Sequence, residues 1–304
     1  MNDPSQGTES SEYGIPPPGF RIHPDTRPAL VRLQVADLER SLAYYERVLG
    51  FRALKRSDGQ TSLGTALDGA ALIELHERPG AAPVPRRGRL GLYHYAILLP
   101  DRVELGRFAR HLTELGERAG ASDHLVSEAL YLQDPDGLGI EVYADRPRSE
   151  WRYRDGQLMM TTQPLDLASL IRAAGTTAWS GMPSGTRIGH IHLHVGDLDE
   201  AAAFYHEALG LDKTVWSYPG ALFLSAGGYH HHLGLNTWAA GAEPAAEVDA
   251  RLLDWELQLP SAEDAERALS SVRAVGYAVE ESAKGGLVQD PWGTALRIRF
   301  VETP

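Results

Sequence analysis

The sequence predicts an α+β protein made of four βαβββ modules, and two observations lead to this fold class. First, the chain repeats itself, because the motif V-x-D-L at residues 35–38 returns at 195–198. Second, each half holds a further, shorter unit of the same kind. That unit closes with a D-P-x-G turn before its last strand, at 134–137 and at 290–293.

The first unit of each half contains a helix whose two ends are marked in the sequence. Asp37 and Asp197 are suited to cap the helix N-terminus, and Gly50 and Gly210 are suited to the left-handed conformation that ends it. The aromatic pair inside each helix is expected to pack in a core rather than to stack on a ligand. Strand-like runs follow each helix, at 51–57, 61–67, 70–76, 211–217, 221–226 and 230–235.

The second unit of each half repeats this plan with different lengths. Helices are expected at 103–118 and 262–275, because apolar residues recur there at helical spacing. The accompanying strands are expected at 92–99, at 124–132 and up to Tyr143 in the first half, and at 252–259 and up to Phe300 in the second.

The repeat also divides the chain into domains of ordinary size, which hold about 100–150 residues. We expect a disordered arm at 1–27, a first two-module domain at 28–145 and a second one at 188–304. The connecting segment at 146–187 carries Trp and Met residues and a helix at 165–174. It is too apolar for a bare linker, so we expect it to pack against a domain.

The composition excludes several classes of function. A net charge of −12 would repel a phosphate backbone, so nucleic acid is not an expected partner. The chain has no cysteine, so any metal must be held by His, Asp or Glu. No signal-like or membrane-spanning apolar segment is present, so we expect a cytoplasmic protein without a membrane partner.

Histidines are concentrated in one part of the chain, where seven of the twelve lie between residues 190 and 232. His190, His192 and His194 share one face of a predicted strand, because side chains alternate along a strand. A single strand histidine is usually a hydrogen-bonded core or surface residue. Several side by side would leave ring nitrogens unsatisfied, at a cost of roughly 1–3 kcal/mol each. The cluster therefore favours a functional cavity or a metal site.

These motifs resemble those of the vicinal oxygen chelate superfamily, which includes glyoxalase I, fosfomycin-resistance proteins and extradiol ring-cleaving dioxygenases. The features that carry the resemblance are the V-x-D-L junction, the helix ending in L-G and the D-P-x-G turn. The strand at 91–94 and the stretches 123–130 and 226–238 resemble more narrowly the CatE-type catechol 2,3-dioxygenases. The resemblance covers residues 28–300.

The resemblance implies that modules pair into two half-open barrels and that the first and last strands of paired modules hold a metal. The repeat identifies the equivalent first-strand positions as Leu30, His94, His190 and Asp254, and the last-strand positions as Glu141 and Arg297. If the second and third modules pair, His94, Glu141 and His190 form a two-histidine, one-carboxylate set of the kind that suits Fe(II). The usual arrangement places the ligands together in the C-terminal half, where this chain has Asp254 and Arg297.

Two other ligand sets stay open at this stage. Within the first half, Glu74, His94 and Glu141 resemble three of the four ligands of glyoxalase I. Within the second half, His190 or His192 could combine with His232 and Glu256.

An extradiol reaction also needs a group that takes and returns protons near neutral pH, for which histidine is suited. The candidates are His192, His232, which we expect to face the centre of the barrel, and His124. Tyr229 could hydrogen-bond the substrate or dioxygen, whereas His231 is expected to be structural or exposed.

The resemblance therefore predicts an Fe(II)-dependent extradiol dioxygenase that acts on a small aromatic diol and O2. One alternative is a glyoxalase-like isomerase or lyase that uses Mn(II), Zn(II) or Ni(II). Another is a small-molecule-binding protein without a metal. Exposed module edges favour a homodimer.

Overall fold

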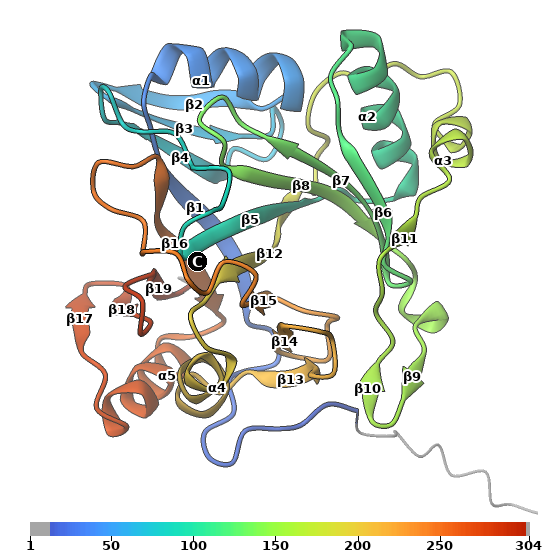
Figure 1. The fold of residues 1–304 in the computed structure, drawn as a ribbon. Coiled ribbons are helices and arrows are strands. Elements are labelled where there is room, and N and C mark those ends of the chain that lie inside the picture. Colours follow the sequence, from blue (N-terminus) through green and yellow to red (C-terminus); the bar gives the residue numbers. More distant parts are fainter. Residues whose placement is uncertain (1–12, 302–304) are drawn as a thin grey trace, which may run out of the picture.

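The computed structural model describes residues 13–301 and has two large sheets and a short hairpin. The eight-stranded sheet has the order β17-β18-β19-β16-β1-β4-β3-β2. The nine-stranded sheet has the order β11-β6-β7-β8-β5-β12-β15-β14-β13 (Figure 1). The predicted α+β fold of four βαβββ units is confirmed.

The two units of the first half account for the strands β1 to β8. The first unit consists of β1 (Arg27–Val35), α1 (Leu38–Tyr44), a π-helical turn (Tyr45–Leu49), β2 (Arg52–Ser57), β3 (Gln60–Gly64) and β4 (Ala71–Glu77). The second consists of β5 (Gly91–Leu98), α2 (Arg102–Leu115), β6 (Gly120–Asp123), β7 (Ser127–Gln133) and β8 (Gly139–Asp145).

The second half repeats both units. The third unit consists of β12 (Arg187–His194), α4 (Leu198–Ala202), a π-helical turn (Ala203–Ala208), β13 (Asp212–Val215), β14 (Ala221–Ser225) and β15 (Leu233–Asn236). The fourth consists of β16 (Arg251–Leu259), α5 (Ala262–Ala274), β17 (Val279–Ser282), β18 (Gly285–Gln289) and β19 (Ala295–Phe300).

The predicted helix ends of the first and third units are found in the structure. The Asp37 carboxylate accepts a hydrogen bond from the Arg40 N–H, and Asp197 accepts from two N–H groups of the next turn. Gly50 ends its helix with φ +84°, and a Cβ added there would lie 2.7 Å from the Cα of Gly181. Both the backbone conformation and the close approach therefore require glycine at this position.

Each sheet combines one unit from each half of the chain. Strand β1 pairs with β16, and β5 pairs with β12, both antiparallel. Residues 28–145 and 188–304 therefore share both sheets and lie side by side. That each of them is a domain of its own stays a prediction. The consequence for the site is that residues of the second and third units share one sheet face.

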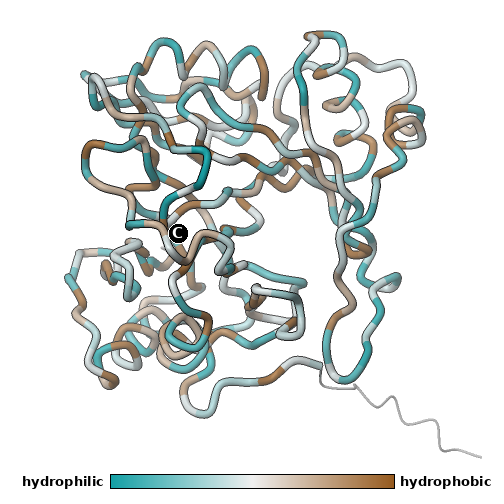
Figure 2. The backbone as a smooth tube through the Cα atoms, viewed as in Figure 1, coloured by the Kyte–Doolittle hydropathy of each residue, from teal (hydrophilic) through white to brown (hydrophobic). Residues whose placement is uncertain are grey.

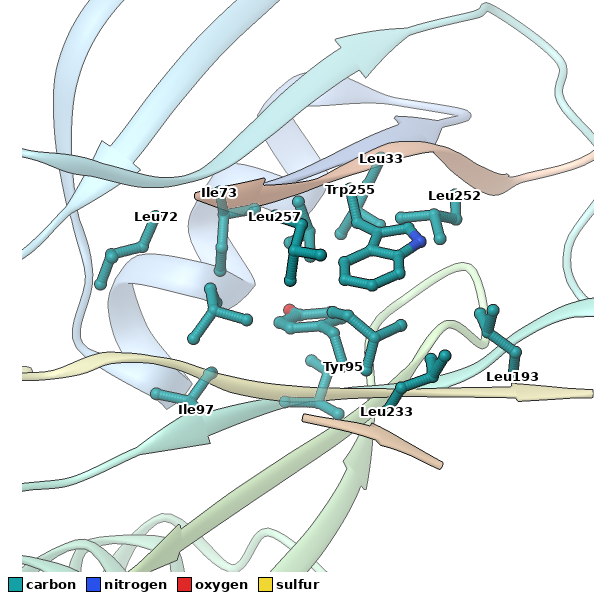
Figure 3. Close-up of a cluster of buried hydrophobic side chains, with 14 of the residues drawn as sticks. Leu33, Leu72, Ile73, Tyr95, Ile97, Leu193, Leu233, Leu252, Trp255 and Leu257 are labelled. Carbon is teal, nitrogen blue, oxygen red and sulfur yellow. The ribbon is translucent and has the colours of Figure 1, made fainter. Parts of the chain in front are cut away.

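The main core lies between the two sheets. Figure 3 shows Tyr95 and Ile97 of β5 facing Trp255 and Leu257 of β16, and all four are fully buried. One tyrosine–aspartate hydrogen bond also joins the two units of each half. The Tyr45 hydroxyl lies 3.4 Å from Asp134 Oδ2, and the Tyr205 hydroxyl lies 3.0 Å from Asp290 Oδ2. Their aspartates come from the two D-P-x-G turns.

Hydrophobic and hydrophilic residues alternate along the helices, as Figure 2 shows, because each helix packs one face on the protein and turns the other outward. No helix among residues 13–301 is long and apolar enough to cross a membrane.

The connecting segment packs against the second and third units, as expected from its apolar residues. It contains a short 3-10 helix (Arg148–Glu150), the hairpin of β9 (Tyr153–Arg154) and β10 (Gln157–Leu158), then β11 (Gln163–Pro164) and α3 (Leu167–Ala173). Strand β11 pairs with β6, and α3 packs on α2 so closely that a Cβ on Gly106 would lie 2.3 Å from the Leu170 carbonyl oxygen.

The first twelve residues of the expected N-terminal arm lie outside the described residues. Residues 13–26 differ from the expected disordered arm, because they lie against the third unit. The Tyr13 hydroxyl donates to the Gly228 carbonyl, Ile15 forms a β-bridge with Lys213, and Arg21 pairs with Asp212 at 2.8 Å.

Candidate metal centre

Three adjacent strands of the nine-stranded sheet bring the predicted ligands to one face. In the strand register, Ala96 of β5 lies opposite His190 of β12 on one side and Glu141 of β8 on the other. His94 lies two residues before Ala96 and so points to the same face. The small side chain of Ala96 leaves room between the ligands, so that the three polar side chains can converge.

The three side chains form a compact and buried group. The Nε2 atom of His94 lies 3.0 Å from Oε2 of Glu141, and Nε2 of His190 lies 3.2 Å from the same oxygen. Ligand atoms of all three residues lie within 4.8 Å of one another. The cross-pairing of the second and third units therefore brings together residues far apart in sequence.

Burial and charge set the protonation states of this group. Burial lowers the pKa of His94 and of His190, although Glu141 opposes the shift. Burial would raise the pKa of Glu141, but electrostatic interaction with His190 and His94, together with the hydrogen bond to His190, outweighs it and holds that pKa well below its ordinary value. Neutral imidazoles beside an ionised carboxylate are the forms that bind a divalent cation.

The residues present fit a metal ion. Although His94 Nε2 is close to Glu141, it has no hydrogen bond of acceptable direction among the described residues. A buried ring nitrogen without such a bond is costly, and coordination of a cation would remove that cost. Two histidines and one carboxylate with open positions suit Fe(II) among the common ions.

A cavity of about 220 Å³ opens beside the three ligands. Of the predicted catalytic residues, His192 and His124 line it. His192 is the register partner of His94, and its Nε2 atom has no hydrogen-bond partner among the described residues. His124 Nε2 lies 2.7 Å from the hydroxyl of Tyr131, which also lines the cavity.

His232 and Tyr229 lie outside this cavity, so the expectation that His232 faces the centre of the barrel is wrong. The predicted strand at 230–235 begins only at Leu233, so side chains do not alternate regularly through residues 229–232. Nδ1 of His232 accepts the Ala226 N–H at 3.2 Å, and its ring stacks on Tyr229. Their positions argue against direct contact with a ligand in the cavity.

His231, which was expected to be structural or exposed, is buried and lines the cavity instead. Its Nδ1 atom lies 2.7 Å from Nδ1 of His230, whose Nε2 lies 3.0 Å from Oδ1 of Asp145. Sequence reasoning missed this residue because three consecutive histidines occupy a loop, where strand alternation does not apply. The only signal in the sequence was the histidine run itself.

When both imidazoles are neutral, the hydrogen bond that Asp145 accepts from His230 sets the tautomer of His231. A carboxylate only accepts hydrogen bonds, so His230 donates from Nε2 and accepts at Nδ1. His231 must then donate from Nδ1, which leaves its Nε2 unprotonated. Burial lowers the pKa of His231 well below its ordinary value, which also favours this neutral form.

The equivalent face of the eight-stranded sheet has an ion-pair network in place of ligands. Arg32 nitrogens lie 2.7 Å from oxygens of each of Glu74, Asp254 and Glu256. Arg297 also pairs with Asp254, at 3.0 Å. Glu74 and Glu256 are thus held by Arg32 on a different sheet, so the two alternative ligand sets are not assembled.

The family model described as the Glyoxalase/Bleomycin resistance protein/Dioxygenase superfamily matches residues 27–142 and 187–298. The chain is 49% identical over 284 residues to a protein named catechol-2,3-dioxygenase from Bacillus subtilis (strain 168). That match covers 92% of this chain and 99% of the relative.

Two solved structures share the fold. A protein from Bacillus subtilis subsp. subtilis str. 168 is 14% identical with a TM-score of 0.61, over 93% of this chain and 86% of that chain. Glyoxalase I from Zea mays is 17% identical with a TM-score of 0.53, over 91% of this chain and 92% of that chain. At these identities the likeness concerns the fold alone.

Proposed function

The chain belongs to the Glyoxalase/Bleomycin resistance protein/Dioxygenase superfamily, and from this premise we propose that it is an Fe(II)-dependent extradiol dioxygenase acting on small aromatic diols. The observation that carries the proposal is the convergence of His94, Glu141 and His190 on one point beside a cavity. The name of the relative that is 49% identical over nearly its whole length supports the same reaction.

In this proposal His94, Glu141 and His190 would hold the metal. Bound Fe(II) would supply the redox chemistry that lets the diol react with dioxygen. The protein's own contribution is to orient the aromatic ring and exclude water from it. Tyr93, Phe223 and Trp238 line the cavity and provide apolar surface for this purpose.

His231 is our candidate for the base that removes a proton from the diol. Its unprotonated Nε2 atom follows from the hydrogen bonds through His230 to Asp145. His192 also lines the cavity, and its Nε2 atom, without a partner among the described residues, is proposed to hydrogen-bond the bound substrate. His124 lines the cavity as well, but its ring nitrogens lie 2.8 Å from the Thr161 carbonyl oxygen and 2.7 Å from the Tyr131 hydroxyl, so we propose that it acts through Tyr131.

The glyoxalase-like alternative has less support from the geometry. Its ligand set would need Glu74, which lies on the other sheet and pairs with Arg32. Three protein ligands rather than four leave more open positions on a metal, which favours a reaction with two exogenous partners.

The test is anaerobic reconstitution with Fe(II), followed by measurement of bound iron and of oxygen uptake with a panel of catechols. We expect bound iron and a ring-cleaved product. Glu141→Gln should lose most of the iron, whereas Glu114→Gln, which changes an exposed carboxylate on α2, should bind iron like the wild type. Bound iron without oxygen uptake on any catechol would refute the proposal.

A further inference from the structure

We propose that the natural substrate is a catechol with an extended apolar substituent, which lies in a second cavity outside the metal cavity. This inference rests on the proposed dioxygenase function and adds the class of diol that the site accepts. The second cavity has a volume of about 780 Å³.

The two cavities are adjacent and share part of their lining. Met160, Thr161, Tyr218 and Trp238 line both of them. A substrate whose hydroxyl groups face the metal ligands would have to pass between these four residues to reach the outer cavity. A substituent on the far side of the ring would enter the outer cavity.

Part of the wall of the outer cavity is apolar and comes from two parts of the chain. The connecting segment contributes Leu158 and Met159, and the third unit contributes Val215. Polar and charged side chains line the rest of it, namely Arg154, Asp155, Gln157, Thr161, Gln163 and Ser217. Of these, Gln157 is engaged, because its Oε1 atom accepts hydrogen bonds from the backbone N–H groups of Trp216 and Ser217, at 2.8 and 2.9 Å. Methionine side chains adapt to irregular ligands, so Met159 and Met160 suit an apolar substituent of variable shape.

The wall is fixed in place by a small core of its own. Leu158 and Trp151 of the connecting segment pack with Val215, Phe223 and Tyr229 of the third unit. The hairpin β9–β10 therefore forms a built surface beside β13, as Figure 1 shows. A cavity between two packed surfaces keeps its shape, which a specific binding site requires.

The rim of the outer cavity carries an exposed aromatic side chain, Trp238, which is not part of the hydrophobic core. Trp238 is 51% exposed, yet its backbone N–H is held by Asn236 Oδ1 and its ring N–H lies near the Pro219 carbonyl oxygen. Across the rim, the Thr162 hydroxyl lies 3.1 Å from the Tyr218 hydroxyl. A positioned and exposed tryptophan next to a cavity is typical of a ligand contact.

The experiment compares kcat/KM for catechol with that for 3- and 4-alkylcatechols from methyl to butyl. Burial of each added methylene should raise kcat/KM about three- to fourfold in at least one of the two series. The readout for variants is the ratio of kcat/KM for the preferred butylcatechol to that for catechol.

Met159→Trp should lower this ratio about tenfold or more, because the indole would fill the outer cavity. Met159 lines the outer cavity but not the inner one, so cleavage of catechol itself should be retained. Met159→Ala enlarges the cavity and should shift the preferred substituent to a longer chain, so a poorly folded Trp variant would not end the test. Leu167→Trp, on the exposed start of α3, is the matched control and should keep the wild-type ratio.

The outcomes separate this inference from the proposed function. If catechol is cleaved but kcat/KM stays flat or falls along both alkyl series, the outer cavity does not bind the substituent. If the iron-loaded enzyme cleaves neither catechol nor any alkylcatechol, the proposed function itself is wrong and this inference fails with it.

Discussion

Asp145 lies outside the metal cavity, yet its carboxylate influences which ring nitrogen of His231 carries the proton inside the cavity. Asp145 Oδ1 accepts from His230 Nε2 and also from the Tyr229 hydroxyl, at 3.0 and 3.1 Å. The Tyr229 hydroxyl in turn lies 2.7 Å from that of Tyr143. Asp145 is thus a positioning residue for His231, since it orients the ring of His230 without reaching the cavity itself.

We expect Asp145→Ala to lower kcat about 10- to 100-fold with little change in KM, because His230 and His231 could then adopt either tautomer. Iron content should stay at the wild-type level, because none of the three ligands is changed. Steady-state kinetics and metal analysis on the same preparation check both points.

Asp145→Glu, which retains an acceptor, should recover part of the activity. An Asp145→Ala variant with unchanged kcat would show that the tautomer of His231 does not matter for the reaction.

Strand β12 carries two functions on its two faces. His190 and His192 face the cavity, whereas Ile191 and Leu193 belong to the core between the sheets. This alternation needs an exact register with β5, and Gly189 helps to fix it. A Cβ at Gly189 would lie 1.9 Å from the Tyr143 hydroxyl and 3.0 Å from the Leu98 Cβ.

Gly189→Ala should therefore destabilise the protein by about 1–3 kcal/mol, because the buried Tyr143 must move. Tyr143 lies two residues after Glu141 on β8, so iron affinity should fall as well. Chemical unfolding and iron titration measure the two effects.

Gly19→Ala is the control, because nothing lies within 4 Å of a Cβ added there. Equal stability of the two variants would mean that the close packing at Gly189 is relieved without cost.

The whole molecule uses two related sheets in different ways. The nine-stranded sheet holds the candidate ligands, whereas the eight-stranded sheet holds Arg32 among three carboxylates. Burial would lower the pKa of Arg32, but hydrogen bonds to Glu256 and Asp254 outweigh it and raise that pKa. A fixed guanidinium charge thus neutralises buried carboxylates where the related sheet could bind a cation.

Arg32→Met should destabilise the protein by about 3 kcal/mol, because buried carboxylates lose their central partner. Iron binding should be retained, because the change lies on the other sheet. Arg152→Met, at an exposed position, should have the stability of the wild type.

Urea unfolding of both variants and metal analysis provide the measurements. A loss of iron in well-folded Arg32→Met would contradict the separation of roles between the two sheets.

The repeat made most of the fold predictable, because the same capping and turn residues recur in both halves. The family resemblance and the α+β class are confirmed. The resemblance implied that His94, Glu141 and His190 would share a site if the second and third units paired, and the structure brings these three residues together. The cytoplasmic location and the homodimer stay predictions.

Other parts of the site could not be predicted for physical reasons. The side-chain directions of His231 and His232 depend on a loop that precedes β15, where neither helical nor strand periodicity operates. The outer cavity depends on the connecting segment, whose position is set by contacts of Leu158 and Trp151 with residues distant in sequence.

Because β5 and β12 pair across the connecting segment, cleavage of the chain within that segment would separate the candidate ligands. His94 and Glu141 precede residues 146–187, and His190 follows them, so a break within that segment would leave neither fragment with a full set of donors. Iron retained by a mixture of the two fragments would then report that they had reassembled.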